Sequence, residues 1–140
     1  MKKLSLSILF VIVASLFAAR AQAQVLVIAN PDFKADSVSK ADLHEVFTGS
    51  STSLKASGHV VPVLLKEGPV HVKFLSEYVG QSPTGFVLCW RGAILSGRGT
   101  MPKTFESEAA VVDYVARTPG AIGYIGSGTA HDSVKVLAVK

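Results

Sequence analysis

Two short stretches of the chain combine cationic side chains with glycine, a combination suited to holding an anion. The first is expected where a strand ends and a helix begins, so that helix N–H groups, a lysine and a histidine would face one ligand. The second is a glycine-containing loop that offers a guanidinium, backbone amides and a hydroxyl. The candidate ligand residues are Lys66, Gly68 and His71 in the first stretch and Arg98, Gly99 and Thr100 in the second.

Each stretch also has a simpler interpretation. Pro69 has no N–H group and therefore removes one donor from the helix start, where Lys66 and Glu67 would be solvated residues of an ordinary turn. A single Gly-x-Gly sequence is more often a flexible surface turn than a binding loop. The patterns favour the simpler interpretation in both places, and an oxyanion site is the functional alternative.

The other reactive residues form no recognisable catalytic or metal-binding pattern. The histidines lack the paired spacing of a metal site, and no serine, histidine and acid fall into a nucleophile motif. Cys89 is the only cysteine, which excludes an intrachain disulfide and a multi-cysteine metal site. We therefore expect neither an enzyme nor a cofactor, with histidines on the surface and Cys89 as a small buried residue.

The N-terminal segment has the features of a secretory signal peptide. A pair of lysines precedes an apolar run over residues 4–19, and residues 21–23 (Ala-Gln-Ala) are small where a signal peptidase cuts. The run is shorter than the roughly 20 apolar residues that a membrane span needs. We expect a signal peptide over 1–23 and one domain over 24–140, periplasmic or secreted, with no membrane span after cleavage.

Removal of that segment changes the electrostatics of the protein. The whole chain has 14 basic and 10 acidic side chains, a formal charge of +4, and Lys2, Lys3 and Arg20 belong to the segment. The remaining 117 residues carry 11 basic and 10 acidic side chains, a charge of +1, without a basic cluster. Nucleic-acid binding therefore has little electrostatic support. The length suits a single domain.

Hydrophobic patterns and caps predict the elements that must position the candidate residues. The order is strand, helix, strand, three helices, strand, strand, which predicts an α/β three-layer sandwich with helices on both faces of a sheet. Strands are expected over 25–29, 60–65, 121–125 and 134–139, helices after Ser39, Gly68, Ser82 and Ser107, and loops over 50–58 and 97–103.

Two further expectations concern packing inside this sandwich. The helix after Ser82 is apolar nearly all round from residue 86 to residue 95, so we expect it to be the most buried helix. Gly123 lies inside a strongly apolar strand, which indicates close approach of another backbone.

Several of these segments resemble periplasmic phosphate-binding proteins. Residues 27–49, with Asn-Pro after the strand and a helix ending in Val-Phe-Thr-Gly, are similar to the family's helix that ends in Ile-Phe-x-Gly. A helix with Phe74, Trp90 in the next helix, the Gly-x-Gly loop and Thr-Pro-Gly-Ala-Ile-Gly-Tyr over 118–124 follow in the family's order. The resemblance implies a small member with one lobe of a type II periplasmic binding protein.

The resemblance also implies a ligand and partners. This chain lacks some of the residues with which the family binds its ligand. Family members place an arginine and Ser-Gly-Thr at a helix start to hold phosphate, where this chain has Leu65 and Pro69-Val70-His71. One expected function is a module that binds phosphate or a similar oxyanion for an ABC permease or a sensor. The other is a ligand-free assembly domain of the envelope that contacts an envelope protein or a second copy as a homodimer.

Overall fold

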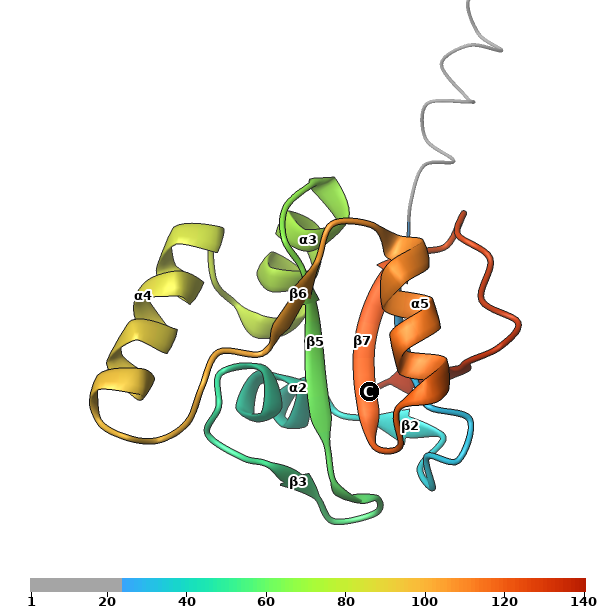
Figure 1. The fold of residues 1–140 in the computed structure, drawn as a ribbon, viewed down its shortest axis with the longest axis horizontal. Coiled ribbons are helices and arrows are strands. Elements are labelled where there is room, and N and C mark those ends of the chain that lie inside the picture. The colour runs from blue at the N-terminus through green and yellow to red at the C-terminus, as the bar shows by residue number, and fades with distance from the viewer. Residues whose placement is uncertain (1–23) are drawn as a thin grey trace, which may run out of the picture.

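A six-stranded mixed sheet forms the centre of the described part of the chain, residues 24–140, in a computed structural model (Figure 1). The predicted signal peptide, residues 1–23, lies outside the described residues. The strand order is β2-β8-β1-β7-β5-β6, and a separate hairpin pairs β3 with β4. The strands are β1 (Val25–Ala29), β2 (Ser37–Val38), β3 (Ser53–Leu54), β4 (Gly58–His59), β5 (Val61–Leu65), β6 (Lys103–Phe105), β7 (Ala121–Gly126) and β8 (Lys135–Val139).

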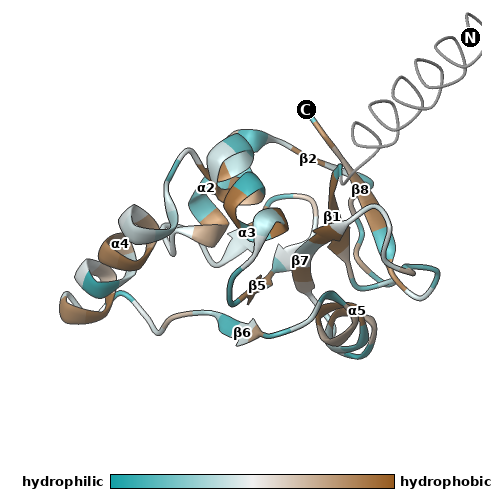
Figure 2. Ribbon diagram, turned by 90° about the horizontal axis from the view of Figure 1, so that it is seen from above, coloured by the Kyte–Doolittle hydropathy of each residue, from teal (hydrophilic) through white to brown (hydrophobic). Residues whose placement is uncertain are grey.

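Helices cover both faces of this sheet, so the predicted three-layer α/β sandwich is confirmed (Figure 2). On one face lie α2 (Lys40–Phe47) and α3 (Pro69–Phe74), and on the other lies α5 (Glu108–Arg117). The chain continues from α3 into a wider π-helical turn, η1 (Leu75–Val79). The remaining helix, α4 (Pro83–Leu95), stands beyond the β5 and β6 edge. None of the helices within residues 24–140 is long and apolar enough to cross a bilayer.

Local capping sets the starts of three helices where the sequence predicts them. The hydroxyls of Ser39, Ser82 and Ser107 accept the backbone N–H of the residue three positions later, at 3.0 Å, 3.1 Å and 3.1 Å. Each bond satisfies one of the N–H groups that a helix start leaves unpaired. The helix starts are therefore encoded by residues that are neighbours in the sequence.

The central strand β7 is buried along its whole length and packs differently on its two sides. At Gly123, a Cβ atom would lie 2.9 Å from Cγ2 of Val63 and 3.1 Å from Cγ1 of Val111. The next residue, Tyr124, stacks on Phe74 with ring centroids 3.8 Å apart, on the face covered by α2 and α3. Gly123 therefore makes room for valine side chains from β5 and α5, and the prediction that another backbone approaches there is wrong.

The structure corrects the prediction that α4 is the most buried helix. Phe86, Trp90 and Ala93 are its buried residues, whereas Leu88 and Leu95 are 58% and 89% exposed. The reason is that the body of the protein covers one side of this helix, although apolar residues occur around it. Cys89 is correspondingly half-buried rather than buried.

The predicted loops contain short strands. Residues 50–58 include β3 and the first residue of β4, and the loop over 97–103 ends in the first residue of β6. Such strands are too short to show a periodic pattern. Since β6 pairs with β5 in parallel, it brings the end of the loop after α4 against the sheet.

Candidate functional site

The two predicted anion-binding stretches lie at opposite ends of β5. Lys66 and Gly68 follow the last residue of this strand, whereas the cavity beside Arg98 is lined by Pro62 near its beginning. A strand of five residues spans about 16 Å. The structure therefore does not bring the two stretches together into one site.

At the end of β5, the chain turns into α3 through Gly68. Its φ of 109° is a conformation that favours glycine, and no side chain caps this helix start. Lys66 is exposed, and its Nζ lies 3.6 Å from Oε1 of Glu106. An anion bound here would therefore compete with a carboxylate for the lysine.

His71 is buried and bonded within the protein, so its predicted place on the surface is wrong. It is 7% exposed, and its Nδ1 is hydrogen-bonded to the hydroxyl of Tyr124. The same phenolic oxygen accepts the N–H of Leu65 at 3.0 Å, which leaves the hydroxyl hydrogen to be donated to Nδ1. Burial lowers the pKa of His71 and raises the pKa of Tyr124, so both are neutral at pH 7.

A second carboxylate occupies the neighbouring end of β7. Oε1 of Glu108 accepts the N–H of Gly126 and, at 3.0 Å, the hydroxyl of Thr129. A Cβ atom at Gly126 would lie 3.2 Å from Cγ2 of Val70, which places this carboxylate close to the start of α3. With Glu106 nearby as well, the end of the sheet at α3 is acidic and disfavours an added anion. The sequence marks Glu108 only as an acid in the first turn of a helix.

The second stretch lines a cavity of about 360 Å³. This cavity, called the Arg98 cavity below, lies between the end of α2, the β3–β4 hairpin, the start of β5, α4 and the loop before β6. Among the described residues, no aspartate or glutamate lines it. Its polar and cationic lining residues are Ser51, Thr52, His59, Arg98, Thr100 and Lys103.

Trp90 and Gly49 form a fixed wall of the Arg98 cavity. The indole N–H of Trp90 donates to the carbonyl of Phe47 at 2.9 Å. A Cβ atom at Gly49 would lie 2.6 Å from Cη2 of the same ring, so only glycine lets the chain pass this closely. Gly49 and Trp90 both belong to the motifs that carry the family resemblance, and the fold brings them together here.

Arg98 is the cation in this cavity whose planar guanidinium suits two-point binding of an oxyanion. Its Nε donates to Oγ of Ser96 at 3.0 Å, and within residues 24–140 it forms no ion pair. By contrast, Nζ of Lys103 lies 5.1 Å from the ring centroid of Tyr114, in a cation–π contact. The terminal N–H groups of Arg98 can therefore bind an oxyanion through two parallel hydrogen bonds.

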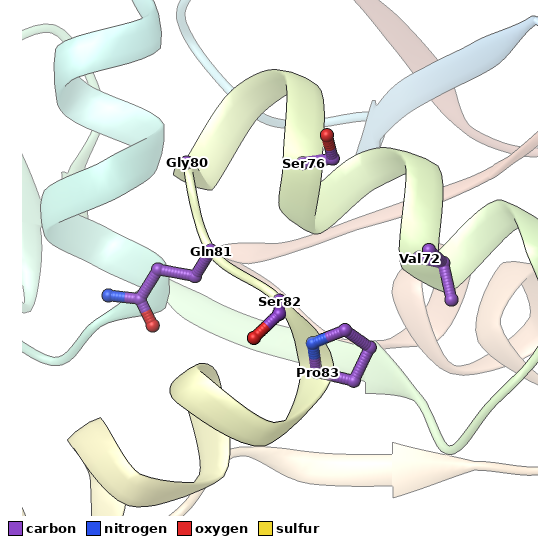
Figure 3. Close-up of a pocket in the computed structure, with 6 residues that line it drawn as sticks. All are labelled: Val72, Ser76, Gly80, Gln81, Ser82 and Pro83. Carbon is purple, nitrogen blue, oxygen red and sulfur yellow. The ribbon is translucent and has the colours of Figure 1, made fainter.

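Another cavity, of about 450 Å³, lies between α3 and the start of α4 (Figure 3). Its lining residues are Val72, Ser76, Gly80, Gln81, Ser82 and Pro83, and none of them is charged. The hydroxyl of Ser82 is already engaged as the cap of α4. In the described part of the chain, no group of three or more histidine, cysteine or acidic residues could hold a metal ion. The Arg98 cavity is therefore the better candidate for an anion.

Comparison with solved structures identifies the fold. The chain is similar to a phosphate ABC transporter substrate-binding protein from Clostridium perfringens with bound phosphate, at a TM-score of 0.66 and 18% identity over 85% of this chain and 46% of that one. An ABC-type phosphate transport receptor from Vibrio cholerae matches at a TM-score of 0.62 and 15% identity, over 84% of this chain and 46% of that one. PstS from Borrelia burgdorferi matches at a TM-score of 0.59 and 17% identity, over 85% of this chain and 47% of that one.

These neighbours confirm the resemblance at the level of the fold. The chain has the fold of part of a phosphate ABC transporter substrate-binding protein, and it spans just under half the length of these neighbours, in agreement with a single lobe. A scan against protein-family models and a search of curated protein sequences give no match. Any binding residues must therefore be argued from this chain itself.

Proposed function

We propose that this protein is an exported, single-lobe solute-binding module that binds phosphate or a similar oxyanion for an ABC permease or a sensor. The observation that carries the proposal is the Arg98 cavity, whose lining among the described residues is free of acids. Gly99 and Thr100 line the same cavity and add backbone amides and a hydroxyl. The fold neighbours support the class of ligand, because one of them contains bound phosphate. Export is supported by the signal-peptide pattern of residues 1–23.

The charges at the two ends of β5 favour this cavity over the start of α3. Oxyanion binding needs hydrogen-bond donors without a competing carboxylate. Lys66 already lies beside Glu106, and the ring of His71 is bonded to Tyr124 in the core. A weaker site at the start of α3 therefore stays a prediction from the sequence, with Lys66, Gly68 and His71 as its residues.

Isothermal titration of the purified protein with phosphate, sulfate and molybdate tests the proposal. At least one anion should give a saturable heat, and Arg98→Gln should weaken that binding about tenfold, the value of one charge-assisted hydrogen bond. Lys66→Gln removes the same charge at the other end of β5 and should leave the affinity unchanged. Loss of binding in Lys66→Gln alone would place the site at α3, and no response to any anion would contradict the proposal.

A second candidate function, a ligand-free assembly domain, is favoured by the outer face of α4. Its exposed apolar residues recur at helical spacing outside the buried stripe of Phe86, Trp90 and Ala93, and much of this ribbon is coloured hydrophobic in Figure 2. They are Val87, Leu88, Ile94 and Leu95, which are 38%, 58%, 47% and 89% exposed. We propose a second copy of the chain as the occupant, since the fold neighbours are about twice as long and one copy supplies a single lobe.

The antiparallel arrangement of two α4 helices suits this apolar face. A twofold axis would set the N-terminal end of each helix beside the C-terminal end of the other, which pairs opposite helix dipoles. Arg91, the only charged residue of α4, lies on this same face between Leu88 and Ile94, so the contact must leave the two guanidinium groups in solvent.

A further inference from the structure

We infer that the Arg98 cavity takes a small organic anion, with its oxyanion group at Arg98 and an apolar body against the apolar residues of the lining, in preference to a bare inorganic ion. This inference rests on the proposed function and names the class of its ligand. It is carried by the size of the cavity, by its apolar lining and by the way Arg98 is held.

The size of the cavity exceeds the needs of an inorganic ion. Its volume of about 360 Å³ lies within the range of roughly 300 to 1,000 Å³ that is typical of sites for small organic molecules. A water molecule occupies about 30 Å³ of the liquid, so the cavity has room for on the order of ten waters. A bare phosphate would leave most of that space filled with solvent, whereas an organic body would displace the water.

Apolar residues make up much of the lining. They include Pro62, Met101 and Pro102 and the nearly buried Val60 and Trp90, which are 2% and 4% exposed. None of these side chains offers a free hydrogen bond to an inorganic ion, and the accessible surface of Pro62, Met101 and Pro102 gains free energy when an apolar ligand covers it. Met101 is 38% exposed and has a flexible side chain that can adapt to the body of a ligand.

Arg98 is held in position at the edge of the cavity by the end of α4. Its Nε donates to Oγ of Ser96 at 3.0 Å, and this hydroxyl in turn donates to the carbonyl of Gly92 at 2.9 Å. The same carbonyl also accepts the backbone N–H of Ser96 at 3.0 Å, so Ser96 is fixed to the last turn of α4 by two bonds. They orient the guanidinium while leaving its terminal nitrogens to a ligand, so the geometry fits one oxyanion group.

The only tryptophan of the sequence, Trp90, is a built-in reporter for this cavity. We would titrate the purified protein with phenyl phosphate, inorganic phosphate and phenol, and follow tryptophan emission. Phenyl phosphate should change the emission saturably and bind at least about tenfold more tightly than inorganic phosphate, as one buried aromatic ring would provide. Phenol should bind at least about tenfold more weakly than phenyl phosphate, because it has no group for Arg98.

Two variants locate the site, and both change exposed side chains. Arg98→Gln should weaken phenyl phosphate about tenfold, whereas Lys66→Gln should bind it like the unmodified protein. Equal affinities for phenyl phosphate and inorganic phosphate, both reduced by Arg98→Gln, would overturn the inference and leave the proposed function standing. Phenol that binds as tightly as phenyl phosphate would overturn the inference, because the anionic group would then contribute nothing to binding. Binding of no anion by fluorescence or calorimetry would overturn both.

Discussion

The phenolic oxygen of Tyr124 joins three elements at one point. It accepts the N–H of Leu65 in β5 at 3.0 Å and is bonded to His71 in α3, while Tyr124 itself belongs to β7. His71 and Tyr124 are 53 positions apart in the chain, so the pattern around each residue gives no sign of the other. A histidine near a helix start therefore looks like a ligand residue in the sequence, although the fold uses it as a buried partner.

This burial predicts a pH dependence at the residue scale. The pKa of His71 lies below its ordinary value of about 6.5, so the unfolded chain binds a proton more readily than the folded one. The stability that His71 contributes is fully present above about pH 6.5 and is lost as the pH falls below that value. The measurement is the free energy of unfolding in urea for the unmodified protein and for His71→Asn, at pH 7.5 and at pH 5.5.

The stability advantage of the unmodified protein over His71→Asn should shrink at the lower pH. Asparagine keeps an acceptor near the position of Nδ1 but does not titrate, and all other titrating groups are shared by the two proteins. An advantage that stays constant or grows between pH 7.5 and pH 5.5 would show that His71 is not held neutral in the core.

At the scale of elements, a glycine in β7 lets the helix layer of α5 pack closely on the sheet, whereas a glycine in α4 has open space around it. Gly123 in β7 lies against Val63 of β5 and Val111 of α5, whereas a Cβ atom at Gly92 in α4 would have no neighbour within 4 Å. Both positions accept the backbone conformation of alanine, because neither glycine has a positive φ. The added methyl group would therefore enter a packed interior at Gly123 and open space at Gly92.

Gly123→Ala should destabilise the protein by about 1 to 3 kcal/mol, because the added methyl group would lie 2.9 Å from a methyl group of Val63. Gly92→Ala should stabilise it by up to about 1 kcal/mol, because alanine favours an exposed helix position. Thermal and urea unfolding of both variants would measure these effects. A Gly123→Ala protein as stable as the unmodified one would mean that α5 does not pack on the sheet this closely.

The elements also show which parts of the fold can be predicted from the sequence. The caps at Ser39, Ser82 and Ser107 and the apolar strands depend on neighbouring residues, and these predictions are confirmed. The burial of α4 depends on how much surface the rest of the molecule offers, and β6 is defined by its pairing with β5, not by a pattern in its own three residues. The Arg98 cavity is assembled from five parts of the fold, so the sequence could indicate its glycine loop but not its lining or its lack of acids.

At the scale of the whole molecule, α4 is the feature that a single copy leaves incomplete. Leu88 and Leu95 are 58% and 89% exposed on a helix that lies outside the three layers. The fold neighbours are proteins of about twice this length. A pair of chains joined through α4 would cover this apolar face and would give an assembly of comparable size.

Light scattering over a range of protein concentrations tests this pairing. The unmodified protein should form a dimer that dissociates on dilution, and Leu88→Glu should be monomeric because burying the added carboxylate costs more than an exposed pair with Arg91 returns. Val136→Glu, at an apolar residue of β8 that is 42% exposed, serves as the control and should still dimerise. A monomer at every concentration, or equal loss of the dimer in both variants, would contradict the role of α4.

The location of the anion site is the central claim, and amide chemical shifts test it most directly. Nitrogen-15 labelled protein would be titrated with phosphate, and the shifts of Gly99 and Thr100 compared with those of Gly68 and Val70. The structure predicts saturable shifts at Gly99 and Thr100, with Gly68 and Val70 unchanged, because the two groups lie at opposite ends of β5. Shifts confined to Gly68 and Val70, or no shifts at all, would contradict the account.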